Sequence, residues 1–411
     1  MKKIGSYSYP DNWELHPLPD VLFLQEGPGI RKKEYQDHGY PMINVRCVQD
    51  GYIDMSKARA ANMELATTKW AHFQIDENDI LFTISGTIGR AAIVKKSDLP
   101  LLMNTSVVRF KPIHPALDLN FVYHYLRSDF FVEMLKDMST GTAIQNVGPS
   151  HLKKLHVPVP PLPEQQRIVS ILDEAFATIA KAKNNAEQNL KNAKELFESY
   201  LQGVFENGNW ETKSLKELTT KIGSGATPRG GQENYKAEGI SLVRSMNVHD
   251  WEFRERNLAF IDEQQAKELD GVSLQENDVL LNITGASVAR CCVFPKEYLP
   301  ARVNQHVSII RPKKELLDAT FLNLLLTSKP YKDQLLFTGE QGATRQAITK
   351  AQIESFRISI PPLKEQHTIV RQLDTLRAET KRLEAIYQQK LLNLEELKKS
   401  VLQKAFRGEL N

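Results

Sequence analysis

Pro160-Pro161-Leu162-Pro163-Glu164-Gln165 opens a long helical pattern that runs to Phe205. The sequence repeats this stretch as Pro361-Pro362-Leu363-Lys364-Glu365-Gln366, which opens a second pattern running to Phe406. Laid over each other without a gap, residues 160–205 and 361–406 share 19 of 46 identities at a constant offset of 201. The two stretches are therefore copies, and the rest of the chain is organised around them.

Each copy carries apolar residues at a mean spacing of about 3.5, the period of a helix that keeps one seam against a partner helix. The alanine-rich first seam is Ile168, Leu172, Ala175, Ile179, Ala182, Ala186, Asn189, Ala193, Leu196, Tyr200 and Gly203. The leucine-rich second seam is Ile369, Leu373, Leu376, Thr380, Leu383, Tyr387, Lys390, Leu394, Leu397, Val401 and Lys404. Because small residues that face large ones allow close approach, we predict that the two helices pair with each other.

The ends of both patterns agree with helices. Proline and glutamate suit a first helical turn, and Gly208 and Gly408 follow the last periodic residues, where a C-terminal glycine is common. A helix of about 42 residues is roughly 63 Å long. That length is typical of a spacer, and the plain alternative is a solvent-bridging stalk or a dimerisation coil.

The composition is that of a soluble globular protein. The 411 residues predict two or three domains, and 41% are hydrophobic and 25% charged. There is no apolar run of 18 or more and no cationic hydrophobic leader, so we expect no membrane span or secretory signal and a cytoplasmic, prokaryotic location. The net charge of +3 does not indicate nucleic acid, so any basic face must be local.

Motifs for catalysis, metal binding and disulfides are missing. Cys47, Cys291 and Cys292 have neither zinc-ligand spacing nor a disulfide framework, and we expect them to be buried apolar residues. The sequence lacks an N/D-P-P-Y/F motif for methylating an exocyclic amine and a G-x-x-x-x-G-K-[ST] phosphate loop. Gly223-Ser224-Gly225 has no third glycine of a dinucleotide fingerprint, so a surface loop is expected there. We therefore expect a chain that is not an enzyme and binds no metal or cofactor itself.

The segments before the two helices repeat as well. Trp13-Glu14 aligns with Trp210-Glu211, the run Asn78–Gly86 with Asn277–Gly285, and Asn104–Pro112 with Asn304–Pro312, at offsets of 197 to 200. Outside this framework the halves diverge in polar, glycine-rich loops. The chain is thus a tandem duplication of a unit about 200 residues long, as expected of one scaffold that presents two recognition surfaces.

The predicted fold is α+β: a globular module followed by a long helix, twice. We place the first module at 1–159, the first helix at 160–207, the second module at 208–360 and the second helix at 361–411. If the helices pair as an antiparallel coiled coil, a pseudo-twofold axis passes between them.

With these features the chain resembles the DNA specificity subunit of Type I restriction-modification systems. The resemblance rests on the order module, helix, module, helix and on the P-P-L-x-E-Q entry to both helices. It also rests on the N-D-[IV]-L strand followed by Ser or Thr and Gly, and on a G-x-x-x-Q loop before each proline exit. It spans essentially the whole chain.

The resemblance implies that each module is a target recognition domain reading one half of a split, asymmetric DNA sequence. It implies that the coiled coil acts as a ruler for the spacer between the halves. The implied partners are double-stranded DNA, two methyltransferase (modification) subunits that bind S-adenosylmethionine and methylate adenine, and restriction subunits using ATP with Mg. The catalytic chemistry would belong to those partners.

Loop residues are the candidates for DNA contacts, because side chains reach base edges and phosphates from loops on a rigid framework. In the first module they are Arg31, Lys32, Lys33, Arg46, Ser85, Thr87, Arg90, Thr142, Gln145 and Asn146. In the second module they are Ser224, Thr227, Arg229, Arg244, Asn247, Thr284, Ser287, Arg290, Thr344, Arg345 and Gln346. Arg90 and Arg290 have framework ion pairs as their alternative role.

Two other functions are open at this point. One is a specificity subunit of a methylation-only system, which neighbouring genes would separate from the main hypothesis. The other is a coiled-coil adaptor whose modules bind proteins and not DNA. On the helices, charges outside the seam are either solvated or dock the methyltransferase subunits: Lys181, Lys183, Lys191, Lys194, Glu395, Glu396, Lys398 and Lys399.

Overall fold

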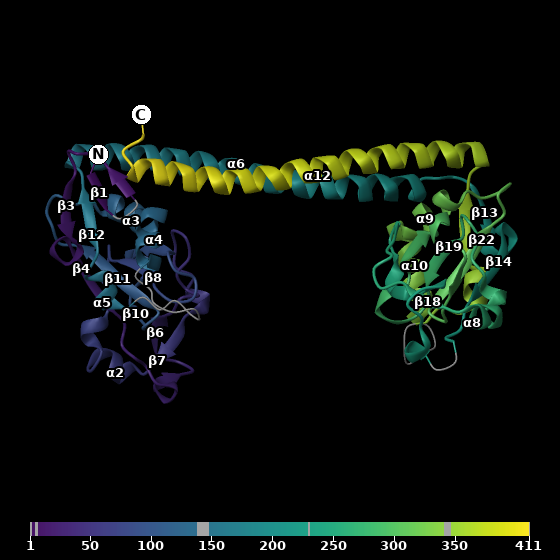
Figure 1. Ribbon diagram of the computed structural model, residues 1–411, viewed down its shortest axis with the longest axis horizontal. Coiled ribbons are helices and arrows are strands. Elements are labelled where there is room, and N and C mark those ends of the chain that lie inside the picture. The colour runs from purple at the N-terminus through teal and green to yellow at the C-terminus, as the bar shows by residue number, and fades with distance from the viewer. Residues whose placement is uncertain (1, 5–6, 138–147, 229–230, 341–346, 411) are drawn as a thin grey trace. The chain divides into compact units, whose positions relative to one another are not determined.

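The computed structural model describes residues 2–4, 7–137, 148–228, 231–340 and 347–410 (Figure 1). The chain divides into two compact units, one of residues 1–186 with 389–411 and the other of residues 187–388. Each unit holds one module together with part of both long helices, α6 (Leu162–Glu206) and α12 (Leu363–Phe406). The predicted domain limits, which separate modules from helices, stay predictions.

Unit 1 is built on two four-stranded sheets. The antiparallel sheet has the order β4 (Leu22–Glu26), β11 (Val107–Pro112), β8 (Ile80–Thr83) and β9 (Ala91–Ile93). The second has the order β10 (Leu102–Met103), β6 (Tyr40–Ile43), β7 (Arg59–Ala61) and β5 (Tyr35–Gln36), with β10 and β6 parallel. Two-stranded ladders join β12 (His156–Val159) to β3 (Glu14–Pro17) and β1 (Lys2–Ile4) to β2 (Tyr7–Tyr9).

The helices of unit 1 pack against its two sheets. They are α1 (Leu18–Val21), α2 (Met63–Thr67), α3 (Leu119–Arg127), α4 (Asp129–Asp137) and α5 (Pro149–Leu152). All four side chains of β8 are buried, as expected for an apolar strand covered on both faces. The core brings Phe82 and Phe110 of the sheet against Phe131, and Tyr125 of α3 against Phe406 of α12.

Unit 2 repeats this plan. Its antiparallel sheet has the order β14 (Thr219–Ser224), β22 (Val307–Pro312), β19 (Val279–Asn282) and β20 (Cys291–Val293). A second sheet has the order β18 (Ala259–Ile261), β15 (Ile240–Val243) and β21 (Ala301–Val303), with β15 and β21 parallel. Ladders join β13 (Glu211–Ser214) to β23 (Arg357–Ile360) and β16 (Val248–His249) to β17 (Glu252–Phe253). Its short helices are α7 (Leu215–Leu218), α8 (Glu263–Glu268), α9 (Ala319–Thr327), α10 (Lys329–Glu340) and α11 (Lys350–Ser355).

The P-P-L-x-E-Q motif attaches each long helix to its module through a buried glutamine. The Gln165 side chain is fully buried; its Oε1 accepts a hydrogen bond from the Asp118 amide at 2.8 Å. Its Nε2 donates to the carbonyls of Ala116 at 2.6 Å and Pro160 at 2.8 Å. Asp118 in turn caps α3 by accepting from the Phe121 amide. The motif is therefore a structural latch between the start of α6 and the start of α3.

Gln366 repeats the latch in unit 2. It is also fully buried, and its Oε1 accepts from the Asp318 amide at 2.9 Å. Its Nε2 donates to the carbonyls of Leu316 and Pro361, both at 2.9 Å. Because all hydrogen-bonding groups of the amide have partners, the same local sequence produces the same joint twice.

The N-D-[IV]-L motif is likewise part of the framework. Asn78 and Asn277 have φ values of 67° and 68°, a left-handed conformation that asparagine tolerates better than most residues. The aspartate that follows is fully buried in both units: Asp79 pairs with Arg109 at 3.1 Å, and Asp278 pairs with Arg311 at 2.7 Å. The motif thus ties the strand to its neighbour in the sheet.

The two long helices pair antiparallel, as predicted. In unit 1, Lys183 of α6 contacts Glu395 of α12 at 2.6 Å, and Arg167 near the start of α6 donates to the Leu410 carbonyl beyond α12. In unit 2, Phe197 of α6 and Arg377 of α12 both contact Trp251.

The predicted seam was wrong in the C-terminal half of each helix. Leu196, Tyr200 and Leu397 are 48%, 44% and 49% exposed, and Asn189, Lys390 and Lys404 are exposed too. Of the predicted positions there, Ala193 is buried, and the other buried positions are Phe197, Leu201 and Phe205 in α6, and Leu402, Ala405 and Phe406 in α12. An α-helix has 3.6 residues per turn, so a strict 3.5 repeat drifts off the buried face. The last turns also pack into the module cores rather than only against the partner helix.

Candidate nucleic-acid interface

Three loops of unit 2 converge at one end of its antiparallel sheet. They follow β14, follow β19 and precede β22, so the order of the strands brings them together. Thr284 Oγ1 lies 2.6 Å from His306 Nδ1, and His306 Nε2 lies 3.1 Å from Gln305 Nε2. The Thr227 hydroxyl donates to Gln305 Oε1. We name Thr227, Thr284, Gln305 and His306 the unit 2 loop cluster.

A glycine lets the first of these loops approach the sheet. The Gly225 amide donates to the Asn304 carbonyl at 3.1 Å, and a Cβ on Gly225 would lie 1.6 Å from the Val303 carbonyl oxygen. Gly27 holds the same place in unit 1, where a Cβ would lie 2.3 Å from the Met103 carbonyl oxygen. Only glycine fits either position, so both modules share this close approach despite their divergent loops.

The corresponding end of the sheet in unit 1 carries a similar set of polar groups. Ser106 Oγ accepts from the Val45 amide at 3.0 Å and donates to Asn104 Oδ1 at 2.5 Å. The Ile84 amide donates to the Ser106 carbonyl at 3.1 Å, which brings in the loop between β8 and β9. These contacts fix the loop that carries Ser85 and Thr87.

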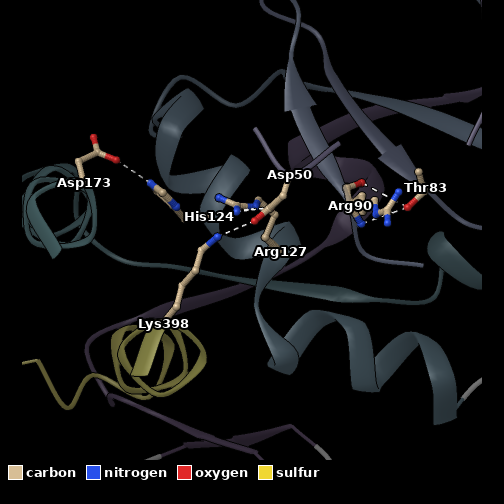
Figure 2. Close-up of polar contacts among 7 residues, drawn as sticks. All are labelled: Asp50, Thr83, Arg90, His124, Arg127, Asp173 and Lys398. Carbon is tan, nitrogen blue, oxygen red and sulfur yellow. Dashed lines mark hydrogen bonds and ion pairs between the residues drawn. The ribbon is translucent and has the colours of Figure 1, made fainter. Parts of the chain in front are cut away.

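The loop between β8 and β9 is closed by its own hydrogen bonds. Figure 2 shows the Thr83 hydroxyl beside Arg90, whose amide donates to it at 3.0 Å. The hydroxyl also donates to the Thr87 carbonyl at 2.5 Å. Thr87 is exposed, and Ser85 and Arg90 are half-buried. The loop is therefore held in one conformation while it presents polar side chains.

Other predicted residues of unit 1 lie on separate loops. Arg31, Lys32 and Lys33 are exposed around the 3-10 helix Lys32–Glu34, where the Arg31 amide donates to Glu34 at 2.6 Å. Arg46 is exposed in the turn after β6. Glu26, at the end of β4, is half-buried, and burial raises the pKa of its carboxyl above the ordinary value.

In unit 2 the predicted residues divide into exposed and structural ones. Ser224 is exposed, and Ser287 and Arg290 are half-buried in the loop between β19 and β20. Arg244 is half-buried, with its guanidinium 5.4 Å from the Tyr235 ring centre and donating to the Asn257 carbonyl.

Asn247 is a correction to the predicted set. Its side chain is fully buried, accepts from the Arg244 amide at 3.1 Å and donates to the Arg254 carbonyl at 2.8 Å. This amide supports the loop and is not available for DNA. Seven predicted residues lie outside the described ranges: Thr142, Gln145, Asn146, Arg229, Thr344, Arg345 and Gln346.

Sequence reasoning missed Gln305 and His306. They lie between Asn304 and β22, in a stretch that had been aligned with Asn104–Pro112 as common framework. The signal was present, because the two residues after the shared asparagine differ between the halves: Thr105-Ser106 in one and Gln305-His306 in the other.

The loops described above supply hydroxyl, amide, imidazole and guanidinium groups. Within the described ranges, no three histidine, cysteine, aspartate or glutamate side chains gather closely enough to hold a metal ion. The cysteines are free and buried, as predicted, and burial raises the pKa of Cys292 to about 12. In the part of the chain that the structure describes, no helix has the length and apolar character needed to cross a membrane.

Fold and loops together define a duplicated recognition protein, in which one scaffold carries two different polar surfaces. The chain belongs to the family of the Type I restriction modification DNA specificity domain, whose model matches residues 10–191 and 207–393.

Curated relatives match along most of the chain. It is 25% identical over 402 residues to a putative type I restriction enzyme MjaX specificity subunit of Methanocaldococcus jannaschii, covering 91% of this chain and 89% of the relative. It is 24% identical over 432 residues to the type I restriction enzyme EcoKI specificity subunit of Escherichia coli, covering 98% and 90%.

Solved structures share the fold. One chain, from a study of complex assembly and conformational transition of the type I R-M system, aligns with a TM-score of 0.71 and 21% identity over 98% of this chain and 100% of that one. The HsdS subunit from Thermoanaerobacter tengcongensis aligns with a TM-score of 0.63 and 19% identity over 99% of both chains.

Proposed function

We propose that this chain is the DNA specificity subunit of a Type I restriction-modification system, and that its two modules read the two halves of a split, asymmetric DNA sequence. One observation carries the proposal: the modules share the glutamine latch, the buried aspartate-arginine pair and the glycine that lets a loop approach the sheet, yet their loops differ in sequence. A duplicated framework with divergent polar loops is suited to reading two different sequences. Membership of the specificity-domain family supports this function.

The proposed contacts are those loop residues whose side chains the fold leaves available. Arginine and lysine bind guanine edges or phosphates, asparagine and glutamine bind adenine edges, and hydroxyls accept or donate to several bases. In the described part of the chain we propose Arg31, Lys32, Lys33, Arg46, Ser85, Thr87, Arg90, Ser224, Thr227, Arg244, Thr284, Ser287 and Arg290, and we add Gln305 and His306. The predicted residues outside the described ranges stay in the proposal; Asn247 leaves it.

The paired helices would act as the ruler between the two half-sites. Half-sites one helical turn apart require readers separated by roughly 34 to 36 Å. The 45 residues of α6 make a helix about 67 Å long, which is ample for that distance.

The chain would work with DNA and methyltransferase subunits. We propose two methyltransferase subunits, which would take the methyl group for adenine from S-adenosylmethionine, and restriction subunits that use ATP with Mg. The catalytic groups would then lie in those partners, and this chain would supply sequence selection. Two modules with different loops would explain an asymmetric target.

Methylation mapping tests the function. A host expressing this chain with its neighbouring methyltransferase is compared, by single-molecule sequencing, with a host lacking this chain. We expect modified adenines in a two-part motif with a fixed gap that vanishes without the chain. If the complex assembles but no motif depends on this chain, the protein-binding adaptor hypothesis replaces the proposal.

Gln305→Ala tests the unit 2 loop cluster. If the amide reads a base, DNA binding weakens by about 1 to 3 kcal/mol and sequence preference relaxes at one position. Gln264→Ala is the matched control, because Gln264 is also exposed but lies on α8. Equal affinity and equal preference for both variants would remove Gln305 from the interface.

A further inference from the structure

A short hairpin in unit 1 continues directly from the turn that carries Arg46. Val48 and Ile53 form an isolated antiparallel bridge, and the Asp54 amide donates to the Cys47 carbonyl at 2.7 Å. The Gln49 side chain donates back to the Arg46 carbonyl at 2.7 Å. Turn and hairpin are therefore one hydrogen-bonded piece, with Arg46 at its base.

The tip of this hairpin contacts a long helix through Asp50. Figure 2 shows the Asp50 carboxylate between Arg127 of α3 and Lys398 of α12, with Lys398 Nζ 2.6 Å from Asp50 Oδ2. Burial opposes ionisation of Asp50, but Arg127 and Lys398 outweigh it and hold its pKa below the ordinary value. The chain separates Asp50 from Lys398 by 348 residues, so this contact joins the recognition module to a distant segment.

The other long helix takes part in the same junction. Lys398 Nζ lies 5.5 Å from the Phe176 ring centre of α6, and Arg127 Cζ lies 6.0 Å from it. On the next turn of α6, Asp173 Oδ1 lies 3.0 Å from Nε2 of the buried His124. Asp50 thus reaches the helix pair at a point where both helices are held against α3.

Unit 2 uses its equivalent hairpin in a different way. The tip between β16 and β17 presents Trp251, whose ring packs edge-on against Phe197 of α6 at 5.3 Å. Arg377 of α12 lies over the same ring, 5.1 Å from its centre. Asp250, which matches Asp50 in the repeat, contacts Lys332 of α10 instead of a long helix. The hairpin reaches the helices in both units, by charge in unit 1 and by an aromatic ring in unit 2.

Resting on the DNA-reading function proposed above, we propose that residues 48–53 form a positioning device that fixes the Arg46 recognition turn relative to the helix pair. Asp50 is its positioning residue and Lys398 its anchor. These residues hold the DNA-contacting side chains of unit 1 in a fixed position relative to the helix pair. Loss of the Asp50–Lys398 contact should therefore alter recognition of one half-site and leave recognition of the other unchanged.

Methylation mapping of variants in the complex with the methyltransferase tests this. Lys398→Gln removes only the ion pair with α12, whereas Asp50→Asn removes that pair and the one with Arg127. Lys111→Gln is the control, because it removes an exposed ion pair of the same unit, Lys111 Nζ to Asp76 Oδ2 at 3.6 Å, that involves neither the hairpin nor a long helix. Partly exposed ion pairs contribute about 0.2 to 1 kcal/mol, so we expect discrimination in one half of the motif to fall by up to about fivefold. The double variant should lose no more than Asp50→Asn alone.

Several outcomes would overturn the positioning role. They are an unchanged motif in both Asp50→Asn and Lys398→Gln, an equal loss in both halves, or the same loss in Lys111→Gln. Thermal unfolding of Lys398→Gln and Lys111→Gln should give equal midpoints; a lower midpoint for Lys398→Gln alone would make the hairpin a stability element instead. A wild-type chain that directs no two-part motif would refute the proposed function itself, which is a separate result.

Discussion

Replacing Gln165 with methionine tests the latch that joins α6 to unit 1. The change keeps the length and apolar stem of the side chain but removes an amide that makes three hydrogen bonds of 2.6 to 2.8 Å in a fully buried position. It leaves the Asp118 amide and the carbonyls of Ala116 and Pro160 without that partner.

A buried polar group left without its partner costs about 1 to 3 kcal/mol. The three groups lie in one site, and a single local rearrangement can partly compensate all of them, so their losses are not fully additive. We therefore expect a total loss of about 3 to 5 kcal/mol in the free energy of unfolding of unit 1. That is a large share of the free energy of unfolding of a typical domain, which is about 5 to 15 kcal/mol. Gln366→Met should lower the stability of unit 2 by a similar amount, because its three hydrogen bonds are the same.

Hydrogen-deuterium exchange with mass spectrometry measures this, because peptides report each unit separately. Under mild urea, Gln165→Met should speed exchange in the peptides of α3 and β8 and leave those of α9 and β19 unchanged. Gln188→Met is the control, since Gln188 is exposed on the same helix. Among the described contacts, its side chain makes one hydrogen bond, to the exposed Asn192 side chain at 2.8 Å. A loss below about 1 kcal/mol, or one equal to that of Gln188→Met, would refute the latch as a source of stability.

Two further predictions concern buried groups of unit 2. Burial raises the pKa of Cys292 to about 12 from an ordinary 9.0, so between these pH values the unfolded state binds fewer protons than the folded state. The free energy of unfolding should therefore fall as pH rises, by about 1.4 kcal/mol per pH unit at most. In Cys292→Ala the urea midpoint should depend less on pH across that range, and the same pH dependence as in the wild type would contradict this. Asp278→Ala leaves Arg311 without its buried partner and should lower the free energy of unfolding in urea by about 3 to 5 kcal/mol. Glu252→Ala, which breaks the exposed pair with Arg254, should lower it by less than about 1 kcal/mol. Similar losses in the two variants would show that burial does not make the Asp278–Arg311 pair more important for stability.

The parts of the fold that were predictable are those encoded by short, local patterns. The helices and the repeated framework follow from P-P-L-x-E-Q and N-D-[IV]-L, because each motif makes the same contacts in both units. The glutamine bonds to the segment before α3 or α9, and the aspartate pairs with an arginine of the neighbouring strand. The seam of α6 failed beyond Ala193 because burial of Phe197 and Phe205 depends on side chains of the module, which periodicity does not report.

The candidate interface was predictable as loops and less so as residues. Thr227 and Thr284 lie in the unit 2 loop cluster as anticipated, yet their contacts are Gln305 and His306, from a loop taken for framework. Asn247 was misjudged because residue type does not reveal exposure: an asparagine after an arginine reads the same whether it faces solvent or closes a turn. The contacts of Thr227 and Thr284 in the cluster span 78 and 22 residues, whereas those of Asn247 span only three to nine.

The position of Phe406 has a consequence for how the protein is made. Its ring packs against Phe121 and Tyr125 in the core of unit 1, beside Leu402 and Ala405. During synthesis the first module emerges early, but its core stays open until the ribosome has passed Phe406. The module that appears first is therefore completed last, and a chain interrupted within α12 exposes aromatic surface that proteases and chaperones recognise.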